Sequence, residues 1–251
     1  MAKIYKDGYD TEDGLSIEVY TPDMPGDIIY FHGADESIDL PYDLLGDTGT
    51  ACVNIMGVDW NHDLTPWSAP GLGKNQPDFG GGADAYLKRL LFEIVPQAED
   101  CLTNMVDVPE LEPWHKEKLP VSMQKAGWPR RRMIGGVSLS GLFALYACYR
   151  TDFFQGAASI SGSLWYDRFL DFMGEYKIWQ GMTDVYLSLG DKEKNAKNPR
   201  LASVEVCTEK AHKLLADAGI RTCFEHNPGG HFSDGEERIR KAFAWLLAAE
   251  A

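Results

Sequence analysis

The stretch GGVSLSGL, residues 135–142, decides the fold of this 251-residue chain. The apolar run that leads into it, residues 132–137, has the length and composition of a buried β-strand. A second apolar run, residues 141–149, follows and is typical of a helix. The octapeptide therefore predicts a sharp strand-to-helix turn with Ser138 at its apex. A serine in this context exposes its hydroxyl and can act as a nucleophile.

Two serines lie in this turn, and the sizes of their neighbours distinguish them. Strand and helix approach closely there, so the residues two before and two after the serine must be small. For Ser138 these residues are Gly136 and Ser140, which are both small, whereas for Ser140 one of them is the bulky Leu142. Ser138 is therefore the better candidate. The full motif has glycine where Ser140 stands, and a glycine-rich turn without catalysis is the alternative.

Outside this turn, short β-rich runs alternate with segments of helical periodicity. Such alternation predicts an α/β protein with a mostly parallel central sheet and helices on both faces, a three-layer αβα architecture. The length fits one domain that spans residues 1–251. The expected strands are 16–21, 27–31, 51–58, 132–137, 156–160, 185–189 and 222–226, and the expected helices are 84–106, 141–149, 200–218 and 236–249.

One segment interrupts the alternation. Residues 107–128 contain three prolines and two tryptophans, and they lie between the helix expected at 84–106 and the strand that leads to Ser138. Prolines disfavour a regular helix or a central strand. We favour a connecting insertion with a short helix, and the alternative is a small cap beside the site.

Composition and charge exclude several classes of function. Hydrophobic residues make up 44% of the chain and charged residues 25%, which is ordinary for a globular protein. The formal net charge is −14, and so acidic a surface repels phosphate backbones and anionic lipid headgroups. Nucleic acids and membranes are therefore poor partners. The chain is expected to be cytoplasmic, because it shows no apolar signal core and no apolar run of membrane-spanning length.

The sequence predicts no metal site and no cofactor. The five cysteines are odd in number and form no CxxC pair, which disfavours a disulfide framework or a cysteine zinc site. His62 and Asp63 are adjacent potential ligands, but no second histidine stands at ligand spacing.

A histidine and two acidic residues follow later strands. His231 lies in NPGGHF, residues 227–232, a glycine-rich loop after the last expected strand. A neutral imidazole there can accept the serine proton and return it to a leaving group. Asp191 and Glu193 follow the strand expected at 185–189, and either carboxylate can orient the imidazole; we favour Glu193. The alternatives are a surface-loop histidine and a solvated acidic turn.

Backbone N–H groups complete the expected site. An oxyanion is stabilised by the N–H that follows the nucleophile and by an N–H of the loop after the third strand. These groups belong to Leu139 and to Ala34, or to the neighbouring Gly33, in the HGAD sequence at 32–35. We expect His32 itself to be a structural residue that supports this loop.

Each of the four candidate site segments follows a different expected strand. They contain Ser138, residues 191–193, His231 and residues 32–35. Ligands of open parallel sheets bind beyond the carboxyl ends of the strands. The order serine, acid, histidine along the chain is the order of α/β-hydrolases. The sequence therefore predicts the α/β-hydrolase fold and a serine hydrolase that cleaves carboxylic esters of small molecules through an acyl-enzyme.

Three stretches of the chain resemble the esterase branch of the α/β-hydrolases, which includes feruloyl esterases, S-formylglutathione hydrolases and enterobactin-type siderophore esterases. The resemblance implies a triad of Ser138, Glu193 and His231, and it implies that Trp165 lies near the site. The branch spans several substrates, so the resemblance implies a chemistry and not one ester. The stretches are GGVSLSGLFALYA (135–147), SISGSLWYD (159–167) and GGHF (229–232).

The segment DWNHDLTPW, residues 59–67, is rich in aromatic and polar side chains and follows the strand expected at 51–58. One interpretation is a wall of the substrate pocket, with Trp67 as a substrate-binding residue. The other is a packed surface loop built on Asx turns. The sequence supports both equally.

The same site residues are compatible with other functions. One is a different acyl reaction, such as acyl transfer to an alcohol or the hydrolysis of a thioester or an amide. Another is a non-catalytic α/β-hydrolase homologue that binds a small molecule. A binding protein has no need of serine, acid and histidine together, which favours the enzyme. The oligomeric state is left open.

Overall fold

A computed structural model describes residues 4–22, 25–33, 39–105 and 129–248. Its centre is an eight-stranded sheet with the order β1-β2-β4-β3-β7-β8-β9-β10. The β1–β2 and β2–β4 pairs are antiparallel and the other five pairs are parallel, which confirms the mostly parallel sheet. The strands are β1 (Ile4–Asp10), β2 (Ser16–Pro22), β3 (Asp27–His32), β4 (Thr50–Met56), β7 (Arg132–Val137), β8 (Gly156–Ile160), β9 (Asp184–Gly190) and β10 (Arg221–Asn227).

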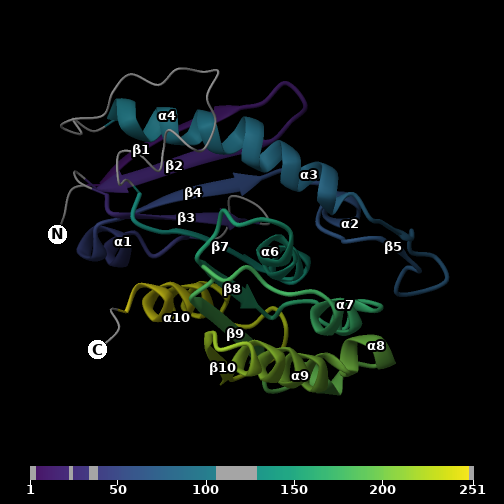
Figure 1. Ribbon diagram of the computed structural model, residues 1–251. Helices are drawn as coiled ribbons and strands as arrows, with labels where there is room; N and C mark the ends of the chain where they lie inside the picture. The colour runs from purple at the N-terminus through teal and green to yellow at the C-terminus, as the bar shows by residue number, and fades with distance from the viewer. Residues whose placement is uncertain (1–3, 23–24, 34–38, 106–128, 249–251) are drawn as a thin grey trace.

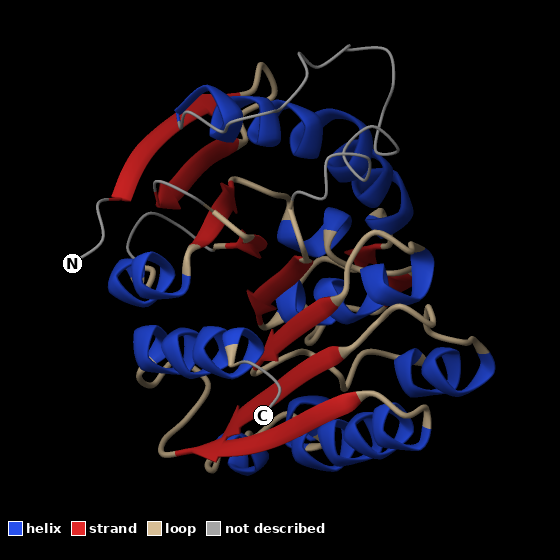
Figure 2. Ribbon diagram, turned by 60° about the vertical axis from the view of Figure 1, so that its left-hand side comes forward, coloured by secondary structure: helices blue, strands red, loops and turns tan. Residues whose placement is uncertain are grey.

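Helices cover both faces of this sheet, as the alternating pattern predicts (Figures 1 and 2). Because side chains alternate along a strand, Ile28 and Tyr30 join one core, whereas Ile29 and Phe31 join the other. The second core is covered by α1 (Tyr42–Thr48) and α10 (Gly235–Leu247). The first is covered by α3 (Ala83–Arg89), the π-helical η1 (Leu90–Ile94), α4 (Val95–Met105), α6 (Leu139–Arg150) and α9 (Val204–Asp217). The architecture is therefore three-layered.

The structure departs from the sequence prediction at several local points. The predicted strands are all present, but β1 was not predicted, because its sequence IYKDGYD is that of a charged edge strand paired only with β2. The helix predicted at 200–218 is divided at Ser203, whose hydroxyl donates to the carbonyl of Arg200 (2.7 Å) in competition with the helical backbone. The further short elements are α2 (Trp60–Asp63), β5 (Ser68–Ala69), β6 (Phe79–Gly80), α7 (Phe169–Glu175), the 3-10 turn η2 (Glu193–Asn195) and α8 (Pro199–Ala202).

The sheet topology brings the loops with the predicted site residues to one edge. The strands β3, β7, β8, β9 and β10 run parallel, so their carboxyl ends lie along the same rim. At this rim Gly190 pairs with Asn227, so the loop after β9 and the loop after β10 start side by side. The segment 107–128, for which a cap or a connecting insertion is predicted, lies outside the described residues.

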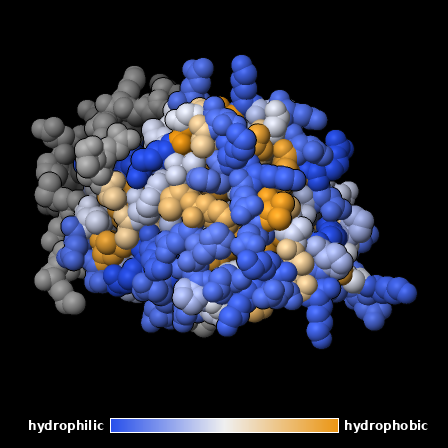
Figure 3. Space-filling model, turned by 90° about the horizontal axis from the view of Figure 1, so that it is seen from below, coloured by the Kyte–Doolittle hydropathy of each residue, from blue (hydrophilic) through white to orange (hydrophobic). Residues whose placement is uncertain are grey.

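The face of the molecule seen in Figure 3 is rich in hydrophilic side chains. Seen from below, it is mostly hydrophilic, with hydrophobic side chains exposed in a band across the middle (Figure 3). None of the helices in the described part of the chain is long and apolar enough to cross a membrane.

Candidate active site

Ser138 occupies a strained turn between β7 and α6. Its backbone has φ 60° and ψ −120°, a conformation that side chains rarely adopt and that is typical of functional sites. A Cβ atom on Gly136 would lie 2.3 Å from Ser140 Oγ, which explains why glycine stands there. Ser140 is fully buried, and its hydroxyl accepts the N–H of Val137 (2.8 Å) and lies 3.1 Å from the carbonyl oxygen of His32. Ser140 therefore holds the turn, and Ser138 is the serine at its apex.

His231 is joined to Glu193 and not to Asp191. The distance from His231 Nδ1 to Glu193 Oε2 is 2.7 Å. Asp191 is exposed, and its carboxylate accepts the backbone N–H of Gly229 (2.9 Å). The structure thus brings together the histidine and the favoured one of the two predicted acids. His226 lies within the last strand, β10, and its Nε2 is 3.0 Å from Oε1 of Glu205 on α9.

The carboxylate of Glu193 is buried and fully engaged. Its Oε1 accepts the backbone N–H of Gly190 and the hydroxyl of Ser161, both at 2.7 Å. Burial acts to raise the pKa of Glu193, but the hydrogen bonds from His231, Gly190 and Ser161 outweigh it, so the pKa lies below its ordinary value. Glu193 is therefore ionised at neutral pH, and an ionised carboxylate is the form that holds an imidazole and stabilises its protonated state.

Two residues of this network were missed from the sequence. Arg238 on α10 is buried, and it donates to Ser161 Oγ (3.0 Å) and to the carbonyls of Pro228 (3.2 Å) and Gly230 (2.9 Å). It also lies 3.4 Å from Glu193 Oε1. Its position could be recognised in the sequence, because Arg238 is a charged residue on the otherwise apolar face of the last helix, four residues before Ala242. Ser161 lies in the SISGSLWYD stretch, but its role depends on a positive φ of 47° that the pattern does not reveal.

Replacing Arg238 by methionine should destabilise the fold by about 3 kcal/mol or more, because it leaves the buried Glu193 carboxylate without a cation. It also frees the Gly230 carbonyl next to His231, so kcat should fall by on the order of 10²-fold. Urea unfolding and ester hydrolysis measure the two effects. Arg240→Met on the same helix is the matched control, because Arg240 pairs with Asp43 at the exposed surface and its loss should leave both the unfolding midpoint and kcat nearly unchanged. Equal losses in both variants would contradict the role given to Arg238.

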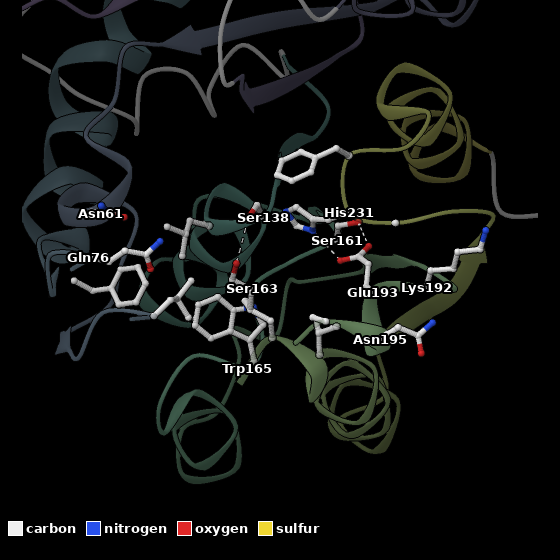
Figure 4. Close-up of a pocket in the computed structure, with 18 of the residues that line it drawn as sticks. Asn61, Gln76, Ser138, Ser161, Ser163, Trp165, Lys192, Glu193, Asn195 and His231 are labelled. Carbon is white, nitrogen blue, oxygen red and sulfur yellow. Dashed lines mark hydrogen bonds and ion pairs between the residues drawn. The ribbon is translucent and has the colours of Figure 1, made fainter. Parts of the chain in front are cut away.

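Ser138, Glu193 and His231 line one cavity of about 610 Å³. Figure 4 shows the imidazole of His231 between Ser138 and Glu193. Ser138 is half-buried, and its Oγ lies 3.4 Å from the hydroxyl of Ser163. The wall is completed by Asn61, Leu72, Gln76, Pro77, Phe79, Leu139, Ser161, Ser163, Trp165, Lys192, Asn195, Ala196, Leu201, Val204, Gly230 and Phe232.

The structure describes two of the three backbone N–H groups that are candidate oxyanion donors, those of Leu139 and Gly33. Leu139 is the first residue of α6, where backbone N–H groups have no partner within the helix, and it lines the cavity. Gly33 donates its N–H to the carbonyl of Ile55 (3.1 Å), so this alternative donor is occupied by the sheet. Ala34, the other predicted donor, lies outside the described residues.

The two predicted substrate-binding tryptophans have different surroundings. Trp165 lines the cavity, with its ring centroid 6.1 Å from that of Phe79. Trp67 packs against Phe172 at 5.7 Å and donates its indole N–H to the carbonyl of Asp167 (2.9 Å). It is not among the described residues that line the cavity. An aromatic cluster therefore holds the ring of Trp67, whereas Asn61 of the same segment, 59–67, lines the cavity.

His32 is a buried residue beneath the site. Its Nε2 lies 2.9 Å from the hydroxyl of Tyr86, and its ring packs edge-on against Phe143. Burial lowers the pKa of His32 to about 3, so the ring is neutral at physiological pH. This environment matches the structural role expected for His32. Among the residues that the structure describes, no group of three or more His, Cys, Asp and Glu side chains is arranged to hold a metal ion.

Sequence comparison offers one distant relative. No family model matches the chain. An uncharacterized protein of Bacillus subtilis (strain 168), YbbA, is 28% identical over 170 residues. The match covers 66% of this chain and 60% of the relative, so less than two thirds of that protein is represented here.

Solved structures of low sequence identity have the same fold. An IroE-like serine hydrolase from Shewanella oneidensis superposes with a TM-score of 0.71 at 14% identity, over 99% of this chain and 82% of that one. The enterobactin hydrolase IroE in complex with DFP gives 0.63 at 18% identity, over 99% and 96%. The siderophore hydrolase EstB from Aspergillus nidulans gives 0.59 at 16% identity, over 96% and 93%. The chain therefore has the α/β-hydrolase fold that these structures share.

Proposed function

We propose that this chain is a serine esterase that hydrolyses carboxylic esters of small molecules through an acyl-enzyme. The observation that carries the proposal is the 2.7 Å contact between His231 and Glu193 in the same cavity as Ser138, the residue at the strained turn. Nucleophile, base and orienting acid in one cavity are the set that acyl transfer needs. The structural neighbours include a serine hydrolase and a siderophore hydrolase, which agrees with this chemistry.

The reaction starts with a rotation of the Ser138 side chain from Ser163 towards His231. Because Nδ1 of the imidazole is held by Glu193, its Nε2 is the nitrogen that accepts the serine proton. Ser138 Oγ then bonds to the ester carbonyl carbon, and the negative charge on the carbonyl oxygen faces the N–H of Leu139. One such donor lowers the barrier by about 3 kcal/mol.

Collapse of the tetrahedral intermediate breaks the bond to the alcohol, which takes the proton from His231. Water then attacks the acyl-enzyme and gives a proton to the same imidazole. The bond between the acyl carbon and Ser138 Oγ breaks, Oγ takes this proton back, and the acid leaves. Glu193 stays ionised throughout and stabilises the imidazolium in both halves. The second predicted donor, the N–H of Ala34, belongs to the same proposal.

Labelling with a fluorophosphonate probe tests the proposal. The probe bonds covalently to an activated serine, so the wild-type protein should be labelled in stoichiometric yield and Ser138→Ala should remain unlabelled. Ser203→Ala is the matched control: it removes a serine hydroxyl between α8 and α9 that is bound to the carbonyl of Arg200 and is not among the described lining residues, and labelling should persist. An unlabelled wild-type protein that still binds small esters would establish the non-catalytic binding protein instead.

The related acyl reactions use the same residues and differ in the acceptor or the leaving group. Amide hydrolysis, thioester hydrolysis and transfer to an alcohol are distinguished by assaying matched amides and thioesters and by adding alcohols to the ester assay. A cytoplasmic location and a site without cofactor remain predictions of the sequence.

A further inference from the structure

The cavity next to Ser138 has a large apolar wall formed by separate segments of the chain. Phe79 and Trp165 form an aromatic pair, with ring centroids 6.1 Å apart. Leu201 and Val204 face the cavity from α8 and from the start of α9. Leu72 and Pro77 add to it from the segment between β5 and β6. This wall can bind a hydrophobic group of the substrate. Its apolar area is larger than the chemistry at an ester bond requires.

Charged groups are scarce in this cavity. Among its described lining residues only Glu193 and Lys192 carry a formal charge, apart from the titratable His231. Figure 4 shows Lys192 on the far side of Glu193 from Trp165, so its ammonium does not face the apolar wall. The whole chain carries a formal net charge of −14, which disfavours the approach of an anion.

The charge of the arginine that packs on the aromatic wall is balanced by an acidic side chain. The guanidinium of Arg200 lies over the ring of Trp165 at 5.3 Å, where it fixes the aromatic wall. It donates to the carbonyl of Pro70 (2.7 Å) and forms an ion pair with Asp167 (3.1 Å). Asp167 balances the charge of Arg200, and Arg200 is not among the described residues that line the cavity. A carboxylate placed against the apolar wall would therefore lose its water without meeting a cation on that wall, and burial of an unpaired charge is strongly unfavourable.

The geometry of catalysis decides which part of an ester meets this wall. His231 must protonate the leaving alcohol, so the alcohol lies on the histidine side of Ser138. Figure 4 shows His231 and Trp165 on different sides of Ser138. The acyl group, which stays bonded to Ser138 when the alcohol leaves, is therefore directed towards Trp165 and Phe79.

We propose that the enzyme is selective for esters of uncharged, apolar acids of medium length, whose acyl group lies against Phe79, Trp165, Leu201 and Val204. The inference rests on the proposed ester hydrolysis. A volume of about 610 Å³ accommodates an acyl group of six or more carbons. Burial of each methylene should raise kcat/KM about fourfold, so hexanoate should exceed acetate by about 10²-fold.

The test compares p-nitrophenyl esters that share one leaving group. Acetate and hexanoate report chain length, and the adipate monoester is the hexanoate analogue with a terminal carboxylate. We expect hexanoate to react about 10²-fold faster than acetate in kcat/KM, and adipate to react at least about tenfold more slowly than hexanoate.

Variants locate the selectivity. Leu201→Trp fills the wall at a partly exposed position and should lower the ratio of hexanoate to acetate by about tenfold or more. The matched control is Val206→Trp, at an exposed position of α9 that is not among the described lining residues; its ratio should equal that of the wild type. Circular dichroism verifies that both variants are folded.

Each outcome has one meaning. Acetate hydrolysis without preference for hexanoate, adipate equal to or better than hexanoate, or equal ratios in the two tryptophan variants overturns the selectivity and leaves the esterase intact. Absence of hydrolysis of all three esters, together with absence of fluorophosphonate labelling, overturns the proposed function and this inference with it.

Discussion

Ser138→Ala should lower kcat for p-nitrophenyl hexanoate by on the order of 10⁴- to 10⁶-fold, because it removes the atom that forms the covalent bond. A small residual rate is expected, since the oxyanion donors and the binding of substrate remain. The fold should be unaffected: Ser138 is half-buried, and among the described residues the only hydrogen-bond partner of its hydroxyl is Ser163, at 3.4 Å. Steady-state kinetics gives the first result, and thermal unfolding followed by circular dichroism gives the second.

The same experiment tests whether the serine and the histidine act as a unit. His231→Ala alone should cost about as much activity as Ser138→Ala. The double variant should be no slower than either single variant, because a base without its nucleophile contributes nothing. Independent, multiplicative losses would show that His231 acts elsewhere in the reaction. A residual activity in Ser138→Ala close to that of the wild type would remove the nucleophile from the mechanism altogether.

Glu193→Ala should reduce kcat by on the order of 10³- to 10⁴-fold, the second large effect that we expect. The loss follows because the imidazole then has no acceptor at Nδ1, so neither its tautomer nor its orientation is held. Glu193→Gln is the sharper variant, because it keeps the size of the side chain and removes its negative charge. Steady-state kinetics with the same ester measures both.

Asp191→Ala is the matched control for the acid. Its carboxylate makes one hydrogen bond to the loop that carries His231, through the N–H of Gly229. Loss of one such bond costs about 1 kcal/mol, so activity should fall by about tenfold at most. A larger loss in Asp191→Ala than in Glu193→Ala would transfer the role of the acid to Asp191. It would also mean that the loop rearranges when substrate binds.

The stability of the site depends on pH through Glu193. Its pKa is lower in the folded protein than its ordinary value, so the ionised carboxylate stabilises the fold above the pKa of the unfolded chain. This contribution is lost as the pH falls through the folded-state pKa. The network around Arg238, Ser161 and Glu193 therefore weakens only under acidic conditions.

The sequence by itself determined the features that depend on near neighbours. The strand-to-helix turn at Ser138 follows from the sizes of Gly136 and Ser140, which meet within one turn of chain. The αβα layers follow from the alternation of strands and helices, because apolar periodicity decides which face of each element is buried. The glycine-rich loop that carries His231 could likewise be recognised from its position after a strand.

Only the tertiary structure decided which distant side chains meet. Asp191 and Glu193 are two residues apart, yet one is exposed and the other is buried against Ser161, which directly follows β8, and Arg238 on α10. The sequence predicts the same role for Trp67 and Trp165, but Trp165 lines the cavity, whereas Trp67 packs among Tyr146, Tyr166 and Phe172. The physical reason is that such contacts arise from the order of strands in the sheet and from the docking of α10, and neither is encoded within the few residues over which a sequence pattern extends.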